Sequence, residues 1–113
     1  MKTALSTFAF FALFLANTNT YANKPKVEEF TIIIKDHLFT PAEVTIPAGK
    51  KVKLIVDNQD PTPEEFESHD LHREKIISGN SKAIIYVGPL KPGTYKFFGE
   101  FNEDTAQGII NVE

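Results

Sequence analysis

The sequence contains no cysteine, and its single methionine is the first residue. Without cysteine no disulfide can staple the chain, so hydrophobic packing must hold the fold together. Lipid attachment to a cysteine after the apolar run near the start is excluded for the same reason. A basic patch is missing as well, because 12 Lys and Arg stand against 15 Asp and Glu, a formal net charge of −3. This balance disfavours nucleic acid and anionic membranes and favours cations as partners.

Residues 1–22 have the three-part layout of a secretory signal peptide. Met1-Lys2 supplies a positive start, Ala4 to Ala16 is almost wholly apolar, and Thr20-Tyr21-Ala22 matches a small-x-Ala cleavage pattern. An apolar run of about 13 residues is short against the roughly 20 that a spanning helix needs. We therefore expect cleavage after Ala22, a periplasmic protein and no direct membrane insertion after cleavage. A retained anchor or a shifted cleavage site is the alternative.

The remaining chain is expected to comprise a polar leader, residues 23–29, and one domain, residues 30–113. Strand signals alternate with turns built on Pro and Gly, and no amphipathic helical window of ten or more residues interrupts them. The predicted strands are Phe30–Lys35, Glu43–Ile46, Lys51–Asp57, a short strand within Glu65–His72, Lys82–Val87, Thr94–Phe98 and Gly108–Val112. Such a series predicts an all-β sandwich or barrel, and antiparallel neighbours with one long crossing favour a Greek-key β-sandwich. The expected interior residues are Val52, Leu54, Val56, Ile84, Tyr95 and Phe97.

Two stretches resemble the cupredoxin superfamily. "FTPAEVTIPAGKKVKLIVDNQD" (39–60) is similar to the opening of cupredoxins, and "LKPGTYKFFG" (90–99) looks like the segment before their C-terminal metal loop. Within the superfamily the chain resembles the EfeO-type cupredoxin-like domain, with "EFE" (65–67) where a blue-copper protein places its first His and "REK" (73–75) after it. The resemblance implies a cupredoxin-like β-sandwich and a part in periplasmic iron uptake beside a ferrous-iron permease or other uptake proteins.

The copper ligands of that resemblance are not in this sequence. Gly99 stands where a blue-copper protein carries Cys, Asn102 stands where it carries His, and Gln107 stands near its usual Met. A type 1 copper site needs the Cys thiolate, so this chain cannot build one. The resemblance therefore implies the fold without the blue-copper chemistry.

Carboxylates provide the alternative donors. Glu65 and Glu67 are two residues apart, so on a strand they share one face and can converge on one ion. Glu100 adjoins the Cys position on a loop that the resemblance places opposite Glu65. Paired carboxylates favour hard cations such as iron, manganese or calcium, and a His neighbour tolerates copper and zinc as well. The competing interpretation is that these are solvated surface charges of an acidic domain.

Three histidines remain. His37 precedes the F-x-P segment that approaches the metal end in similar proteins, so we expect it to be the nitrogen neighbour of the carboxylates, against the alternative of a turn histidine bonded to its own backbone. His69 and His72 are three apart and would point to opposite faces of a strand, which favours surface histidines. The predicted metal residues are thus Glu65, Glu67, Glu100 and His37.

No motif for catalysis stands out, since the chain lacks a nucleophile elbow, an HExxH pair and a glycine-rich phosphate loop. The leading hypothesis is a periplasmic metal-binding accessory that captures or presents iron, or copper, for membrane iron uptake. A second hypothesis is a metal-free cupredoxin scaffold that acts as a protein-interaction module. A third is a ferrous-oxidase subunit. The sequence leaves open the metal and its oxidation state, redox activity, the partner and the oligomeric state.

Overall fold

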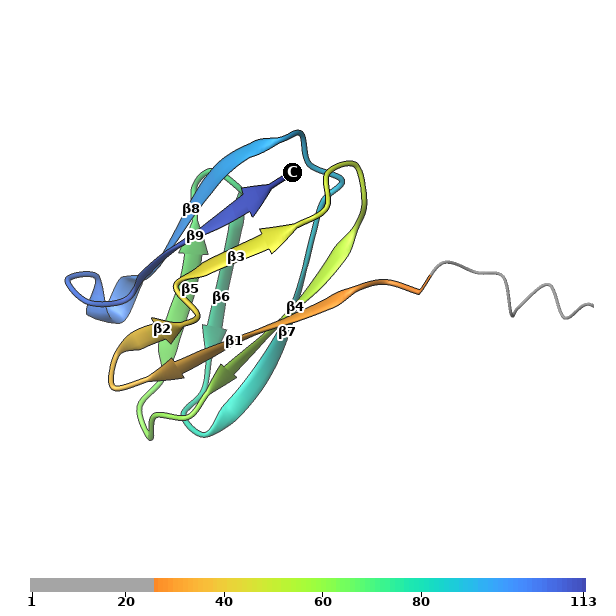
Figure 1. The fold of residues 1–113 in the computed structure, drawn as a ribbon. Helices are drawn as coiled ribbons and strands as arrows, with labels where there is room; N and C mark the ends of the chain where they lie inside the picture. Colours follow the sequence, from red (N-terminus) through yellow and green to blue (C-terminus); the bar gives the residue numbers. More distant parts are fainter. Residues whose placement is uncertain (1–25) are drawn as a thin grey trace, which may run out of the picture.

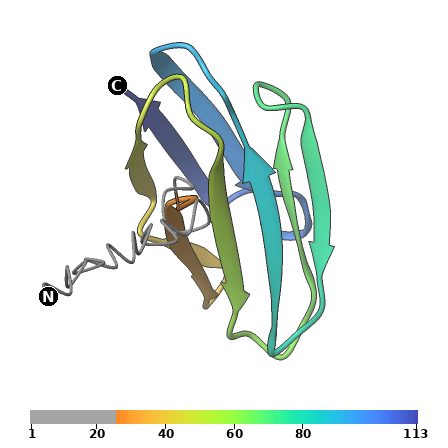
Figure 2. The same ribbon diagram turned by 90° about the vertical axis from the view of Figure 1, so that its right-hand side faces the viewer.

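Residues 26–113 are described by a computed structural model, in which two β-sheets pack face to face (Figure 1, Figure 2). The predicted signal peptide and the first residues of the polar leader lie outside the described residues. The elements, in chain order, are β1 (Glu29–Lys35), β2 (Leu38–Thr40), β3 (Glu43–Ile46), β4 (Val52–Asn58), β5 (Glu64–Ser68), β6 (Arg73–Ile77), β7 (Ser81–Val87), β8 (Gly93–Gly99), the 3₁₀ turn η2 (Glu100–Asn102) and β9 (Gln107–Val112).

One sheet has the strand order β2-β1-β4-β7 and the other has the order β3-β9-β8-β5-β6. Both sheets are mixed, because β1 pairs with β4 and β3 pairs with β9 in parallel. The expected β-sandwich is therefore confirmed, and its antiparallel neighbours are accompanied by two parallel pairs. In each parallel pair the two strands are not joined by a hairpin: β1 pairs with β4, and β3 pairs with β9. No helical segment within residues 26–113 is long and apolar enough to cross a membrane.

The core lies between the sheets and follows the period of two along each strand. In β4 the predicted residues Val52, Leu54 and Val56 are all fully buried, and Phe97 of β8 is 1% exposed. Tyr95 is only partly buried at the edge of this core. The core is completed by Ile32, Ile34, Phe39, Val44, Ile46, Phe66, Leu71, Ile77, Ile85, Val87, Ala106, Ile110 and Val112.

The prediction for Ile84 was wrong. This side chain is 50% exposed on the outer face of β7, while its neighbours Ile85 and Val87 are buried. Four consecutive residues of the strand, Ile84 to Val87, are apolar or aromatic, so their composition cannot define which alternate set faces inward. Pairing with β4 determines the phase, since Leu54, which points into the core, lies opposite Ile85.

Three connections meet at one end of the sandwich, which we call the loop end and define as residues 36–37, 59–63 and 100–105. Asp60 accepts hydrogen bonds from the backbone N–H groups of Asp36 (2.8 Å) and His37 (3.0 Å). The hydroxyl of Thr105 donates to the carbonyl of His37 at 2.6 Å. Figure 1 shows the turn after β8 projecting at this end, beside the β1–β2 hairpin.

Candidate cation site

Four glutamates from two neighbouring strands of one sheet and from the 3₁₀ turn beside them gather near the loop end. Glu65 and Glu67 belong to β5, Glu74 belongs to β6 and Glu100 opens η2. One carboxylate oxygen from each lies within 4.8 Å of the other three. Two oxygens on opposite sides of a single ion, each at about 2.1–2.4 Å from it, would be about 4.2–4.8 Å apart. The spacing of these four glutamates, which we call the acidic group, therefore fits ligation of one cation.

Strand geometry explains why β5 contributes two members. Its inward face carries Glu64, Phe66 and Ser68, each no more than 1% exposed. Phe66 anchors that face by stacking on Phe97, with ring centroids 5.0 Å apart. Because side chains alternate, Glu65 and Glu67 must point to the outer face of the same sheet.

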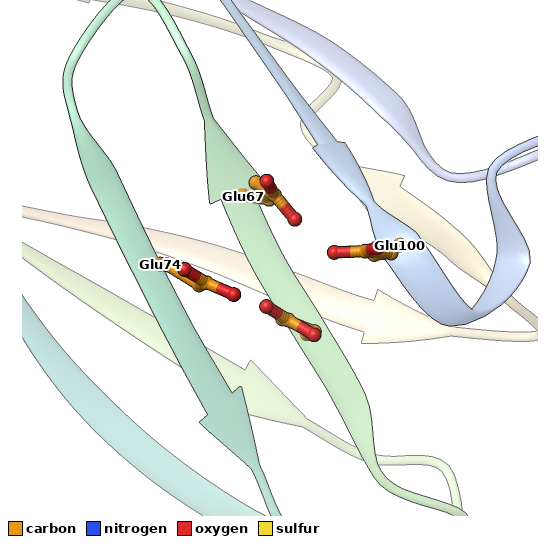
Figure 3. A group of neighbouring side chains, drawn as sticks. Glu67, Glu74 and Glu100 are labelled. Carbon is orange, nitrogen blue, oxygen red and sulfur yellow. The ribbon is translucent and has the colours of Figure 1, made fainter.

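The other two members reach this face from the elements on either side of β5. Glu74 is the Cα partner of Glu67 in the antiparallel β5–β6 pair. Glu100 follows Gly99, which pairs with Phe66 on the opposite edge of β5. In Figure 3 the side chains of Glu67, Glu74 and Glu100 converge over β5 from their separate elements.

Repulsion and burial perturb the acids of β5. The pKa of Glu65 is raised from 4.5 to about 7 by a hydrogen bond shared with the Glu74 carboxyl, by burial and by the charge of Glu100. The pKa of Glu67 is also raised, first by a hydrogen bond with Glu100 and then by burial and by neighbouring charge. A hydrogen bond between two carboxyl groups requires a proton on one of them, so protons reduce the charge when no cation is bound.

Little else in the described residues neutralises the acidic group. The Lys–carboxylate ion pair found within residues 26–113 joins Lys53 to Glu29, and no Lys or Arg lies within 4.0 Å of the four acids. Glu65 is only 6% exposed, and the Oε2 atom of Glu67 is buried without a hydrogen-bond partner. A buried carboxylate oxygen with no donor is costly, and a bound cation would satisfy it.

The structure brings three of the four predicted site residues together: Glu65, Glu67 and Glu100. His37 is not a member of the acidic group. It sits at the tip of the β1–β2 hairpin with a positive φ of 59°, and its Nδ1 lies 3.5 Å from Oδ2 of Asp60. Asp60 thus holds the backbone of His37 and lies beside its half-exposed ring, away from the four glutamates.

The imidazole beside the acidic group belongs to His69. Its Nδ1 lies 3.9 Å from Oε1 of Glu67, and its ring packs at 5.4 Å from that of Phe98. Strand spacing had favoured a plain surface residue, and the side chain is indeed 79% exposed. However, β5 ends at Ser68, so His69 lies in the turn toward β6 and is free of strand alternation.

Gly99 and Asn102, which stand at positions expected for copper ligands, both lie against the side chain of Glu64. The Asn102 side chain donates to Oε2 of Glu64 at 2.6 Å. A Cβ atom added at Gly99 would lie 2.7 Å from Cδ of Glu64, closer than real contacts allow. The resemblance had placed Glu65 at the first-ligand position, but the side chain that meets Gly99 and Asn102 is that of its inward neighbour, Glu64.

The sequence matches a known domain family. The model of the cupredoxin-like domain family matches residues 5–112. The chain belongs to this family. A protein of Rickettsia prowazekii described as uncharacterised is 55% identical over 84 residues, which cover 74% of this chain and 67% of that protein.

Solved structures agree on the fold. The metal-binding domain of the Cu(I)-exporting P-type ATPase CopA from Streptococcus pneumoniae D39 superposes with a TM-score of 0.70 at 14% identity, covering 80% of this chain and 89% of that one. Auracyanin A from Chloroflexus aurantiacus gives 0.68 at 15% identity, with 78% and 100% covered. Amicyanin from Paracoccus versutus gives 0.61 at 19% identity, with 81% and 87% covered. At these identities the likeness establishes the cupredoxin fold alone.

Sequence reasoning missed Glu74 and Glu64. Glu74 lies within the "REK" stretch that carried the family resemblance, but only the register of the β5–β6 hairpin places it opposite Glu67. Glu64 was passed over because two adjacent glutamates begin β5, and the sequence does not tell which of them turns inward. The buried Phe66 was the available signal, since residues two apart on a strand share a face.

Proposed function

We propose that this cupredoxin-like protein is an extracytoplasmic cation-binding accessory that holds iron on its acidic group and presents it to a membrane iron-uptake protein. The observation that carries the proposal is the convergence of Glu65, Glu67, Glu74 and Glu100 within 4.8 Å of one another. The resemblance to EfeO-type domains supplies the iron-uptake context and a ferrous-iron permease as the partner.

The chemistry of the donors supports a hard cation. Carboxylate oxygens suit iron, manganese and calcium, whereas Cu(I) prefers the thiolates and thioethers that are lacking in this group. His69 adds a nitrogen at the rim, 3.9 Å from Glu67, and this donor extends the range to Cu(II) and Zn(II). Copper is included in the trial because structural neighbours are described as copper proteins.

Thermal unfolding of the purified protein tests the proposal. Fe(II), Fe(III), Mn(II), Cu(II), Zn(II) and Ca(II) are added in turn to the wild type and to the double variant Glu65→Gln/Glu100→Gln. A cation present at about 100 times its Kd adds about 2.7 kcal/mol to the free energy of unfolding, a rise in Tm on the order of 10 °C for a domain of this size. We expect this rise in the wild type and its loss in the double variant.

The matched control is Glu103→Gln/Asp104→Asn. It removes the same number of negative charges, from two exposed positions of the loop that also carries Glu100. It should keep the full stabilisation. If no cation stabilises the wild type, or if the control loses as much as the test variant, the site is excluded. The acidic group then becomes a surface for a basic protein partner, the interaction-module function.

The compartment is tested separately. A secreted product whose intact mass corresponds to a start at or near Asn23 supports export with cleavage of residues 1–22. Retention of the apolar run 4–16 in the soluble product would contradict it.

A further inference from the structure

Glu64 is a buried acid whose carboxylate ties two parts of the chain together. It is 1% exposed and points inward from β5, between the two sheets. Its Oε1 accepts hydrogen bonds from the backbone N–H groups of Glu65 at 3.0 Å and Phe101 at 2.9 Å. Its Oε2 accepts one from the side-chain amide of Asn102 at 2.6 Å. We call this carboxylate and its three donors the Glu64 clasp.

Each backbone bond of the clasp acts directly beside a member of the acidic group. One donor is the N–H of Glu65 itself, and another is the N–H of Phe101, the residue after Glu100. The clasp therefore joins the start of β5 to η2, and the bond to Phe101 spans 37 positions of the sequence. It does so from the inner side of the sheet, while the acidic group converges on the outer side.

Glu64 is buried without a basic partner in the part of the chain that the structure describes. Within residues 26–113 no Lys, Arg or His lies within 4.0 Å of the Glu64 carboxylate, so its charge is compensated by hydrogen bonds alone. Hydrogen bonds to a carboxylate are stronger than those between neutral groups, so three of them hold their donors in a defined arrangement. The space for this carboxylate depends on Gly99, where any Cβ would lie 2.9 Å from Oε2.

Glu100 needs such a restraint because of where it lies. It is exposed at the start of a 3₁₀ turn of only three residues, with no side-chain cap, and it faces other acids. Mutual repulsion among like charges would push this turn away from β5 when no cation is bound. A site binds a cation more tightly when its ligands are held in place before the cation arrives, because less order has to be imposed on binding.

We propose that Glu64 is a positioning residue for the cation site: through the clasp it holds Glu100 of η2 against Glu65 of β5, without itself contacting the cation. This inference rests on the proposed function. Outer partners that orient metal ligands typically contribute about 10–100-fold in affinity, so Glu64→Gln should weaken binding within that range. The amide introduced at position 64 could bond Asn102 only if the Asn102 side chain turned its oxygen inward, and that bond would join two neutral groups in place of the charge-assisted bond of the wild type.

The experiment measures cation affinity in four variants at a temperature where circular dichroism shows each to be folded. Mn(II) binding is followed by loss of the free-ion EPR signal, and Fe(II) binding is followed by calorimetry under argon. The variants are Glu64→Gln, Asn102→Asp, the double variant Glu64→Gln/Asn102→Asp and Ser68→Ala. In the double variant the amide introduced at position 64 can donate to the carboxylate introduced at position 102, which restores the bond in the opposite direction.

Ser68→Ala is the control for a general loss of stability. Ser68 is also buried on the inner face of β5, where its hydroxyl donates to the carbonyl of Lys96 and accepts from the N–H of Leu71, away from η2. We expect Glu64→Gln and Asn102→Asp each to weaken both cations about 10-fold or more, the double variant to recover most of the loss, and Ser68→Ala to stay within about twofold of the wild type.

The outcomes separate the two proposals. If the wild type binds but Glu64→Gln binds equally well, or if Ser68→Ala loses as much, Glu64 has no positioning role and the proposed function stands. Tighter binding by Asn102→Asp alone would show that the double variant recovers through an added ligand, and it would also overturn the clasp. If the wild type binds neither cation, the proposed function fails, and the role of Glu64 fails with it.

Discussion

The side-chain amide of Asn102 donates a hydrogen bond to the buried carboxylate of Glu64 at 2.6 Å. These two residues meet beside Gly99, and both Gly99 and Asn102 stand at positions where the resemblance to blue-copper cupredoxins led us to expect metal ligands. An internal hydrogen bond has therefore taken over the interior of the loop end, and Gly99 leaves the room for it. The carboxylates that could bind a cation lie instead on the outer face of β5. There, the buried Oε2 atom of Glu67 has no hydrogen-bond partner.

The phase of the strands can be tested by a matched pair of substitutions. Leu54 is fully buried in β4, so Leu54→Ala should lower the free energy of unfolding by about 2–5 kcal/mol. Ile84 is 50% exposed on β7, and Ile84→Ala should cost well under half as much. Denaturant unfolding of both variants measures the difference. Equal costs would mean that one of the two strands has been assigned the wrong face.

The different outcomes for β4 and β7 show what sequence periodicity can determine. In β4 the buried Val52, Leu54 and Val56 alternate with residues of which two, Lys53 and Asp57, are charged, so the inner face could be recognised. In β7 both faces offer apolar side chains, and the choice is made by pairing with β4. The same ambiguity affected the two glutamates that begin β5, where burial of Phe66 directs Glu64 inward and Glu65 outward.

The sequence indicated members of the candidate site in two ways, through local spacing and through family resemblance. The two-residue spacing of Glu65 and Glu67 is a local signal, and family resemblance brought Glu100 near them. Glu74 depends on the register of a hairpin, with Glu74 opposite Glu67, which no local pattern specifies. The family resemblance had predicted that His37 belongs to the site. In the structure its hairpin is bonded to Asp60 instead, through hydrogen bonds between residues 24 and 23 positions apart.

The cation-free protein should lose stability as the pH rises. The folded pKa of Glu65 is about 7, against an ordinary value of 4.5, so the folded state keeps a proton that the unfolded chain has already released. Its contribution is therefore greatest below about pH 4.5 and is lost between about pH 4.5 and 7. The raised pKa of Glu67 acts with the same sign. Melting curves in the presence of a chelator should show a Tm that falls across this range.

Two variants make this pH dependence specific to the acidic group. Glu65→Gln removes the titrating group and should flatten the fall in Tm, because the amide stays neutral at every pH. Glu103→Gln removes an exposed charge outside the group and should leave the slope as in the wild type. A slope that both variants change equally would indicate a general charge effect rather than the titration of Glu65.

Glu74 should matter for cation binding as much as the residues that the sequence singled out. One of its carboxylate oxygens lies within 4.8 Å of those of Glu65, Glu67 and Glu100. Glu74→Gln should therefore reduce the cation-induced rise in Tm, and Glu103→Gln should not. Since Glu74 is exposed, the substitution should leave the cation-free Tm unchanged or slightly higher. A full rise in Glu74→Gln would restrict the site to β5 and η2.

Added Cu(II) should give weak ligand-field absorption and no intense blue band, because the chain has no thiol to supply the charge-transfer transition.

Any nitrogen ligand should be His69, whose Nδ1 lies 3.9 Å from Glu67 and whose side chain is 79% exposed and free to turn toward the acidic group. His37 is held by Asp60 instead. In Cu(II) EPR spectra, His69→Ala should therefore remove nitrogen hyperfine structure that His37→Ala retains. The reverse result would place His37 at the metal and Asp60 among its neighbours, and an intense thiolate-like band would contradict the assignment of oxygen and nitrogen donors altogether.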